Sequence, residues 1–257
     1  MIPNKPEKVV PLTKKQIKNL LNQKTEVESI RKYEKHTIHS PIPFVRYAHQ
    51  SRIIKCVQYV YPFLEKGKIL DYGCGTGVFI SILNKIKPHS AIGYEPFMKE
   101  KYTKDNPIYP EYNDVLKCSP FDTITIFEVI EHLSNEKFDE FLLRADELFC
   151  KNRGTILVSV PIEIGPVLIP KEIYRVLASI NIEYKILEFL KATFLGIPGE
   201  RIGSITDGYG SHKGFDFRKL LEQFQSKGWH TTILGYGPLP FKHWYGNSQV
   251  FFKAERK

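Results

Sequence analysis

The stretch Lys68-Ile-Leu-Asp-Tyr-Gly-Cys-Gly-Thr-Gly77 decides the fold of this 257-residue chain. Its first four residues, Lys68–Asp71, predict a short buried strand, and three glycines at alternate positions follow almost directly. Because glycine has no Cβ, Gly73, Gly75 and Gly77 let the backbone turn sharply and approach a ligand closely. A helix is predicted after the loop, and its free amides and dipole favour an anionic group at its start. The stretch therefore predicts a ligand-binding α/β unit.

The spacing of the glycines discriminates between ligand classes. A dinucleotide-binding loop has the form Gly-x-Gly-x-x-Gly, whose third glycine would fall on Val78. Gly77 comes one residue earlier, and the acidic residue Asp71 precedes the loop at the end of the strand. The glycines alone would suit a pyrophosphate or a carboxylate, but the spacing argues against a dinucleotide site.

The chain around this unit alternates between strand and helix, as α/β proteins do. Further strands are predicted at 90–95, 108–109, 121–127 and 154–161, and helices at 76–85, 135–149 and 215–227. Two C-terminal segments predict a closing antiparallel pair, at 229–235 and 248–253. These elements predict a mostly parallel sheet with flanking helices.

Residues 1–62 precede this pattern, and we assign them to an N-terminal helical arm or cap in front of a main domain at 63–257. A capping box of Thr13 and Gln16 begins a helix predicted over 13–34, and a second helix is predicted over 47–61.

Residues 162–212 are longer than a usual strand-to-helix connection, and we predict a helical insertion there, with a helix over 171–194. An insertion at this point would lie near the carboxyl ends of the strands, where open α/β sheets bind ligands. The pattern leaves the role of this insertion open: it could be a lid, a substrate-selecting wall, a packed subdomain or a dimer surface.

The bulk composition is that of an ordinary globular protein, with 42% hydrophobic and 25% charged residues. There is neither a secretory signal nor an apolar stretch near the roughly 18 residues of a membrane span, and the four scattered cysteines favour free thiols. A cytoplasmic protein is therefore expected. Residues 1–55 hold 12 Lys and Arg against 4 Asp and Glu, which is most of the net charge of +9. This basic arm would suit nucleic acid, an anionic membrane surface or a phosphorylated acceptor, or it is a solvated lysine-rich helix.

The glycine loop resembles the first motif of the class I S-adenosylmethionine-dependent methyltransferases, Asp-x-Gly-x-Gly-x-Gly. The resemblance covers residues 68–160 well and 213–253 loosely. It implies a Rossmann-like α/β fold with a seven-stranded sheet, mostly parallel with one antiparallel strand, and S-adenosyl-L-methionine as cofactor. The cofactor-binding residues that it implies are Asp71, Gly73, Cys74, Gly75, Gly77, Glu95, Pro96, Asn113, Asp114 and Glu128.

Roles within this set follow from the same resemblance. Glu95 corresponds to the acidic residue that accepts both ribose hydroxyls, as one carboxylate can. Asn113 and Asp114 fall where the family contacts the adenine amino group, and Asp71 would anchor the loop or the cofactor amine.

The segment Phe127-Glu-Val-Ile-Glu-His-Leu133 follows a predicted strand and is expected at the carboxyl edge of the sheet. If it begins a helical turn, Glu128, Glu131 and His132 share one face. Methyl transfer mainly requires alignment of the nucleophile, and a hydroxyl nucleophile also benefits from a base such as histidine. The candidate catalytic residues are therefore Glu128, His132 and a later histidine, His212.

Glu-x-x-Glu-His is similar to sequences in quinone-biosynthesis O-methyltransferases and in small-RNA 3′-terminal 2′-O-methyltransferases. In the latter group this motif and a later histidine hold a divalent metal, which would correspond here to Glu128, Glu131, His132 and His212. The pattern is also widespread in metal-free relatives, where the histidine fixes a loop, so metal-free catalysis is favoured and a metal is left open. His212 could otherwise cap the helix that begins near residue 215.

The segment His212-Lys-Gly-Phe-Asp-Phe and the C-terminal residues also resemble surface-polysaccharide and small-metabolite methyltransferases, which implies a sugar, glycan or phosphorylated small molecule as acceptor. Tyr47, His49, Gln50 and Arg52 form a polar cluster before the first strand, either at the site or on the surface. We predict an O-methyltransferase of a small hydroxylated acceptor. An RNA 2′-O-methyltransferase using a divalent metal and a non-catalytic cofactor-binding protein are the alternatives; the oligomeric state is left open.

Overall fold

The computed structural model describes residues 12–22, 35, 37–98, 105–149, 154–177, 183–201 and 211–256. Seven strands form one sheet: β1 (Ile69–Tyr72), β2 (Ala91–Tyr94), β3 (Ile108–Tyr109), β4 (Thr123–Phe127), β5 (Thr155–Pro161), β6 (Trp229–Gly237) and β7 (Gln249–Arg256). Their order is β3-β2-β1-β4-β5-β7-β6, and β7 runs antiparallel to both of its neighbours while the other pairs are parallel. The predicted Rossmann-like sheet with one antiparallel strand is confirmed.

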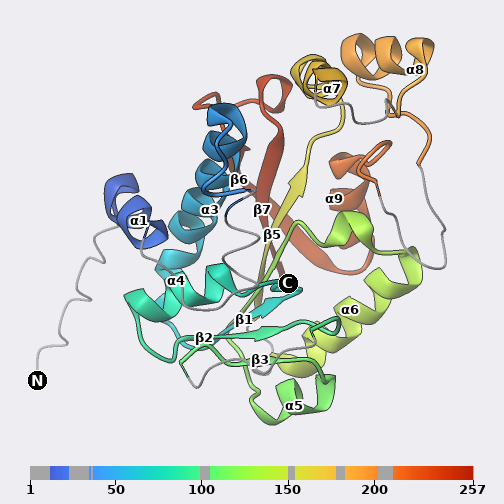
Figure 1. The fold of residues 1–257 in the computed structure, drawn as a ribbon. Coiled ribbons are helices and arrows are strands. Elements are labelled where there is room, and N and C mark those ends of the chain that lie inside the picture. The colour runs from blue at the N-terminus through green and yellow to red at the C-terminus, as the bar shows by residue number, and fades with distance from the viewer. Residues whose placement is uncertain are drawn as a thin grey trace, which may run out of the picture.

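Helices cover both faces of the sheet because its central strands are apolar on both sides. One face carries α1 (Lys14–Leu21), α3 (Pro43–Leu64) and α4 (Val78–Ile86), and the other carries α5 (Tyr112–Lys117), α6 (Asn135–Leu148) and α9 (Phe217–Ser226) (Figure 1). Strand β5 shows the alternation, because Ile156 and Val158 pack toward α6 and α9 whereas Leu157 packs toward α3.

The N-terminal elements begin as their local signals indicate. Thr13 forms the expected capping box with Gln16 at the start of α1, and Ile17 is buried beneath it. The remainder of the helix predicted over 13–34 lies outside the described residues from position 23 on. Helix α3 is longer than predicted and begins at Pro43, since a proline at the first helical position gives up an amide that has no partner there anyway.

The insertion after β5 is helical, as predicted, but its helix is not continuous. It contains α7 (Leu168–Leu177), α8 (Ile186–Leu190) and a π-helical turn, η2 (Lys191–Leu195). The prediction of one helix over 171–194 is wrong at residues 183–185, where the chain leaves the helical conformation. There Tyr184 is buried against Leu168 and Ala192, and this packing holds the non-helical turn.

Two further findings concern predictions from composition. Among the described residues, no helix has the length and apolar character needed to cross a membrane. Cys56, Cys74 and Cys118 are free thiols, as expected, and Cys150 lies outside the described part of the chain.

Candidate active site

The glycine loop after β1 has the geometry that its sequence predicts. Gly73, Gly75 and Gly77 all have positive φ angles, of 76°, 53° and 75°, which L-residues with a side chain adopt only at a cost. Gly77 is the N-cap of α4, so the helix dipole begins at the loop. A Cβ on Gly73 would lie 2.6 Å from Val129, whereas a Cβ on Gly75 would meet no atom of the described residues within 4 Å. The loop therefore leaves open space beside Gly75, as a cradle for a ligand requires.

Glu95 lies directly opposite this loop at the end of β2. Its Oε2 accepts a hydrogen bond from the Gly75 amide at 2.9 Å, and its Oε1 accepts one from the Phe97 amide at 3.2 Å. An ionised carboxylate has further acceptor positions, so the same group can also receive hydroxyl donors of a ligand.

Asp71 is the buried anchor of the loop. Its Oδ1 accepts a hydrogen bond from the Thr125 hydroxyl at 2.7 Å. Burial raises the pKa of the Asp71 carboxyl to about 7, a shift that the Thr125 hydrogen bond reduces and the charge of Glu95 increases. A cationic group held beside Asp71 would stabilise its ionised form.

A cavity of about 620 Å³ opens beside the loop at the carboxyl edge of the sheet, within the range of roughly 300–1,000 Å³ typical of small-molecule sites. Its lining includes Gly73, Glu95, Pro96, Glu128 and His132, five residues predicted for the site. Tyr72 and Tyr94 line it as well, and both of their hydroxyls accept hydrogen bonds from Arg144 Nη1 at 3.2 Å. This cavity is the candidate cofactor site.

Three of the predicted cofactor residues have side chains elsewhere. Cys74 packs toward Ile80 and Gly93, and burial raises the pKa of its thiol, so only its backbone belongs to the loop. Asn113 and Asp114 lie on α5 and are absent from the described lining of the cavity; Asp114 forms an ion pair with Lys117 at 2.7 Å. The assignment of Asn113 and Asp114 to the adenine stays a prediction.

Glu128, at the end of β4, is not part of the helical turn expected for residues 128–132. Its φ is +57° and Val129 is also non-helical, so only Ile130–His132 form a 3₁₀ turn. The Glu128 amide donates to the Ser159 carbonyl at 2.9 Å, and the Ser159 hydroxyl donates to Glu128 Oε1 at 3.0 Å. Contacts to the neighbouring strand β5 thus hold Glu128 in a conformation that non-glycine residues rarely adopt.

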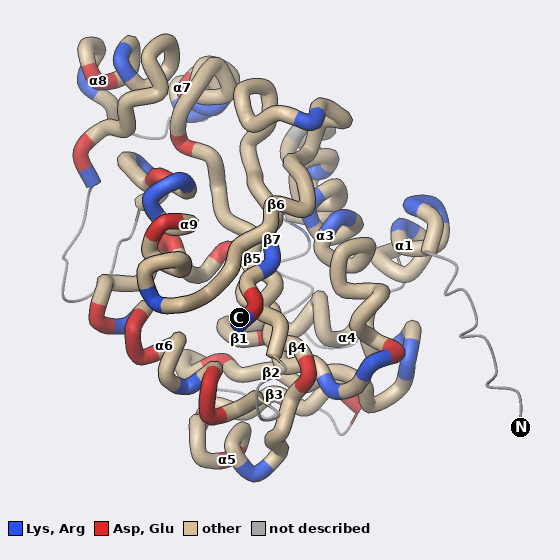
Figure 2. The backbone as a smooth tube through the Cα atoms, turned by 180° about the vertical axis from the view of Figure 1, so that it is seen from behind, with Lys and Arg blue, Asp and Glu red and all other residues tan. Residues whose placement is uncertain are grey.

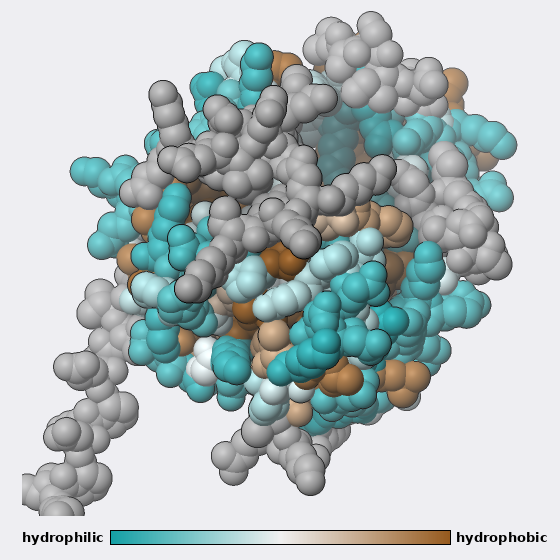
Figure 3. Space-filling view, turned by 60° about the horizontal axis from the view of Figure 1, so that its bottom comes forward, coloured by the Kyte–Doolittle hydropathy of each residue, from teal (hydrophilic) through white to brown (hydrophobic). Residues whose placement is uncertain are grey.

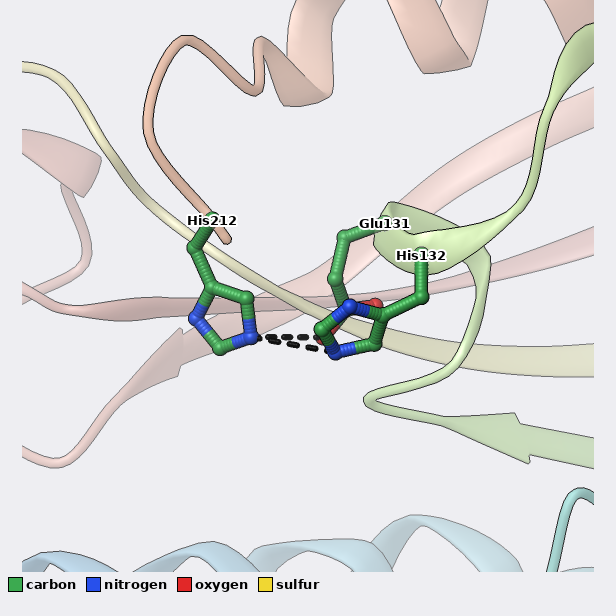
Figure 4. Close-up of side chains that lie close together, drawn as sticks. All are labelled: Glu131, His132 and His212. Carbon is green, nitrogen blue, oxygen red and sulfur yellow. Dashed lines mark hydrogen bonds and ion pairs between the residues drawn. The ribbon is translucent and has the colours of Figure 1, made fainter. Parts of the chain in front are cut away.

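Glu131, His132 and His212 form a cluster of possible metal ligands (Figure 4). One ligand atom from each lies within 4.8 Å of the others, and Nε2 of His132 and Nε2 of His212 lie 3.2 Å apart. Glu131 and His132 come from the 3₁₀ turn after β4, and His212 comes from the loop before α9. His212 does not cap α9, because Asp216 is the N-cap of that helix.

The Glu131 carboxylate is the unusual member of this cluster. Its side chain is fully buried, and neither oxygen accepts a hydrogen bond from the described residues. Oε1 lies 3.8 Å from His212 Nε2 and 4.0 Å from His132 Nε2. Burial and the charge of Glu128 raise the pKa of the Glu131 carboxyl well above its usual range. A buried carboxylate without hydrogen bonds is costly, and a bound cation would remove that cost.

A second carboxylate, Glu163, lies behind His212. Its Oε1 accepts a hydrogen bond from Lys171 Nζ at 2.6 Å and is 3.9 Å from Nδ1 of His212. Burial lowers the pKa of His212, and this effect outweighs the negative charges of Glu163 and Glu128, which raise it. His212 is therefore held mostly as a neutral imidazole at neutral pH, the form that binds a metal or accepts a proton.

A smaller cavity, of about 170 Å³, lies on the other side of Glu128. Polar side chains dominate its lining, and they come from α3, β4, α7 and the segments around β7 and α9: His49, Arg52, Glu128, Lys171, His212, Ser248 and Gln249. Arg52 Nη1 donates to Glu128 Oε2 at 3.3 Å, and its Nη2 lies 3.0 Å from His49 Nδ1. Burial and the charge of Arg52 lower the pKa of His49 to about 4.

The polar cluster predicted from the sequence before the first strand is therefore only partly at the site. His49 and Arg52 reach the site, Gln50 is buried and donates to the Ile38 carbonyl at 3.0 Å, and Tyr47 is exposed. Glu163 and Ser159 were not recognised from the sequence, because an isolated Ser within a strand or an isolated Glu just after one carries no motif.

Comparison with known proteins identifies the family. Residues 45–174, just over half of the chain, match a family model described as a methyltransferase domain. The chain therefore belongs to this methyltransferase family. It is a methyltransferase, and S-adenosylmethionine is the cofactor that its glycine motif predicts. No curated protein matches the chain significantly.

Solved structures share the fold at low sequence identity. Magnesium protoporphyrin IX methyltransferase (ChlM) from Synechocystis PCC 6803, with bound SAH, is 12% identical with a TM-score of 0.50, covering 94% of this chain and 93% of that one. An Anabaena variabilis SAM-dependent methyltransferase is 12% identical with a TM-score of 0.48, covering 91% and 98%. The methyltransferase domain of bacterial CtHen1 is 20% identical with a TM-score of 0.45, covering 80% and 98%.

Proposed function

We propose that this methyltransferase transfers the methyl group to a hydroxyl oxygen of a small acceptor, a sugar, glycan or other hydroxylated metabolite, bound in the smaller cavity. One observation carries the proposal: the two cavities share Glu128, and the histidine pair spans them. His132 lines the cofactor cavity, His212 lines the smaller one, and their Nε2 atoms are 3.2 Å apart.

The cofactor supplies a methyl group on a sulfonium, which is already a good leaving group. The chain must then align the acceptor hydroxyl and exclude water, and alignment alone contributes several kcal/mol, up to about 7–11 kcal/mol in the best cases. A hydroxyl is a poor nucleophile until it loses its proton, so a neighbouring base accelerates the step. The imidazole of His132 or the neutral imidazole of His212 can serve as that base. Glu128, held by Arg52 and Ser159, separates the two cavities and orients the groups on either side.

A divalent metal fits the cluster of Glu131, His132 and His212. One buried carboxylate and two imidazoles are a donor set suited to Mn²⁺, Zn²⁺ or Fe²⁺ and, with added oxygen ligands, to Mg²⁺. Such an ion would act as a Lewis acid toward an acceptor hydroxyl. Glu128 is not within this cluster, because Arg52 and Ser159 hold its carboxylate. The set is therefore Glu131, His132 and His212, rather than the four residues that the motif implies.

The lining of the smaller cavity favours a polar acceptor. Each of its two cationic side chains pairs with a carboxylate: Arg52 with Glu128, and Lys171 with Glu163. The hydroxyl of Ser248 and the amide of Gln249 therefore supply much of the remaining hydrogen-bonding capacity. A sugar, which both donates and accepts hydrogen bonds, suits such a surface. A phosphorylated sugar would compete with Glu128 and Glu163 for the same cations.

Methylation of a ribose 2′-hydroxyl in RNA is the second candidate. The histidine and glutamate cluster would serve a terminal ribose equally well. The basic arm that would hold a phosphate backbone is described only at residues 12–22, 35 and 37–55, where Lys14, Lys15 and Lys18 are exposed. Figure 2 shows the basic positions of α1 in blue.

A methyl-transfer assay tests these proposals. Purified protein with radiolabelled S-adenosylmethionine is screened against monosaccharides, nucleotide sugars, catechols and short RNA, with EDTA or with added Mn²⁺ or Mg²⁺. With an active acceptor, His132→Ala and His212→Ala should each lose most turnover yet bind S-adenosylhomocysteine with nearly unchanged affinity. His230→Ala, at an exposed position on β6, is the matched control and should retain both. Parallel loss of turnover and cofactor affinity in the two site variants would contradict the catalytic role, and transfer to RNA alone would favour the second candidate.

A further inference from the structure

The helical insertion exposes an unusual number of large apolar side chains. Three of them lie on α7: Ile169, Ile173 and Val176. The others lie on α8, on η2 and two residues beyond η2: Ile186, Leu187, Leu190, Phe194, Leu195 and Ile197. Ile186 is 81% exposed and Leu195 68%. We call the surface formed by residues 168–177 and 186–197 the α7–α8 cap. Contiguous apolar surfaces of this kind on a folded protein mark binding sites for another molecule.

The exposure of these side chains is not a failure of packing. The cap has an inner side of its own, where Leu168, Tyr184 and Ala192 are buried together. Ile169, Ile173 and Val176 recur at spacings of four and three, and Ile186, Leu190 and Phe194 at spacings of four, so each helix presents an apolar stripe outward. The helices are thus packed on one side and apolar on the other.

The turn between β6 and β7 extends this surface. Leu239, Phe241 and Tyr245 in the turn are exposed, and α7 and α8 rise beside it at the same end of the molecule (Figure 1). Trp244 connects the two parts, because its ring lies against both Gly165 and Gly196. On the face seen in Figure 3, by contrast, hydrophilic residues predominate and hydrophobic ones show between them.

The charges on this surface are mostly positive. Lys185, Lys191 and Lys242 are exposed among the apolar side chains, against one exposed acidic residue, Glu200, in the described residues of these segments. The other acids are neutralised nearby: Glu188 pairs with Lys213 at 2.8 Å, and Glu183 pairs with Arg175 at 2.8 Å.

We propose that the α7–α8 cap and the β6–β7 turn dock on an anionic lipid bilayer, with the apolar side chains entering the interface and the three lysines contacting lipid headgroups. Apolar and lysine side chains side by side on a helical surface are the combination that binds such membranes. The alternative occupant, a second copy of the chain, fits less well. A twofold interface pairs a patch with itself and would bring two sets of lysines together.

The position of the surface adds a consequence for access to the site. Lys171 of α7 and Ser248 and Gln249, which follow the β6–β7 turn, line the smaller cavity. Docking through the cap would therefore bring this cavity close to the lipid headgroups. The inference does not depend on which acceptor the cavity takes.

Vesicle flotation of the full chain tests the proposal. Wild-type protein should float with vesicles of phosphatidylglycerol and phosphatidylcholine, and much less with phosphatidylcholine alone. Leu187→Glu and Phe194→Glu should each weaken binding about tenfold or more, because a charge replaces a side chain that was transferred to the lipid. Leu143→Glu, on α6 and 72% exposed in the wild type, is the matched control and should bind like the wild type. The basic arm is present in all of these proteins, so a loss confined to the cap variants assigns the contact to the cap.

The variants lie at exposed positions, and unchanged melting temperature and S-adenosylhomocysteine affinity would show that they remain folded. Changing Lys185, Lys191 and Lys242 together to glutamine should reduce binding to anionic vesicles and its sensitivity to salt. Wild-type protein that fails to bind anionic vesicles, or cap variants that bind as well as Leu143→Glu, would overturn the proposal. A dimer in light scattering that Leu187→Glu dissociates, without vesicle binding, would assign the surface to a second copy instead.

Discussion

Replacing Gly75 by arginine should remove cofactor binding while leaving the fold intact. The Gly75 backbone has a φ of +53°, and a Cβ built there meets no atom of the described part of the chain within 4 Å. The cost to stability is therefore backbone strain without a steric clash, about 1–2 kcal/mol for an L-residue in the left-handed region. That cost corresponds to a fall in melting temperature of roughly 2–8 °C for a chain of this size.

The added side chain should, in contrast, fill the space in which the cofactor lies. We expect the dissociation constant for S-adenosylhomocysteine, measured by titration calorimetry, to rise at least about 100-fold, which corresponds to a loss of about 2.7 kcal/mol. Gly75→Ala measures the strain alone. Gly196→Ala is its matched control, because Gly196 also has a positive φ, of 63°, and a Cβ there makes only ordinary contacts with Trp244 and Arg218.

The pattern across these variants decides the matter. Gly75→Ala and Gly196→Ala should melt at similar temperatures, Gly196→Ala should bind the cofactor like the wild type, and Gly75→Arg should not bind it. Micromolar binding by Gly75→Arg would refute the placement of the cofactor beside this loop. An unfolded Gly75→Arg with a folded Gly75→Ala would show that the space beside Gly75 is not free.

Three further predictions concern the charged groups of the site. Mn²⁺ at 100 times its dissociation constant should stabilise the wild type by about 2.7 kcal/mol in thermal unfolding. Glu131→Gln should abolish this gain. An equal rise in the melting temperature of both proteins would place the metal elsewhere. Without cofactor, the wild type should lose stability as the pH rises from about 4 to about 7. The folded state keeps the proton on Asp71 up to its pKa of about 7, whereas the unfolded state loses it near the ordinary aspartate pKa of 3.8. This loss in the free energy of unfolding, measured with urea, should be up to about 4 kcal/mol in the wild type and absent in Asp71→Asn. If the stability of both proteins depends on pH in the same way, the buried carboxyl is not protonated. Glu163→Gln should weaken Mn²⁺ binding about tenfold, as removal of a carboxylate behind a metal-bound histidine commonly does, and unchanged affinity would exclude Glu163 from orienting His212.

Local features of this protein follow from the sequence because their causes lie within a few residues. The turn at Gly73, Gly75 and Gly77 needs backbone angles that glycine adopts at little cost, so the strand–loop–helix unit was predictable with its ligand. The capping box at Thr13 is of the same kind. The two-residue strand β3 was also predicted at the correct residues, and it pairs with β2 at the edge of the sheet.

The same reasoning failed where distant segments override local preference. The pattern at residues 128–132 fits a helical turn, yet hydrogen bonds to Ser159 on the neighbouring strand hold Glu128 at a positive φ. The apolar periodicity of 171–194 fits one helix, yet burial of Tyr184 interrupts it. In both places a tertiary contact outweighs a helix propensity of a few tenths of a kcal/mol per residue.

The sequence by itself determined the class of this protein: a methyltransferase fold and a cofactor loop, because glycine spacing and strand patterns act locally. Only the tertiary structure decided how the catalytic groups are divided. It brings together His132 and His212, which are 80 residues apart in the sequence, and Glu128 and Arg52, which are 76 apart. The two histidines thus belong to the candidate metal cluster, whereas the Glu128 carboxylate lies between the two cavities. No spacing in the sequence specifies these contacts, since they depend on which ends of the strands and loops meet at the carboxyl edge of the sheet.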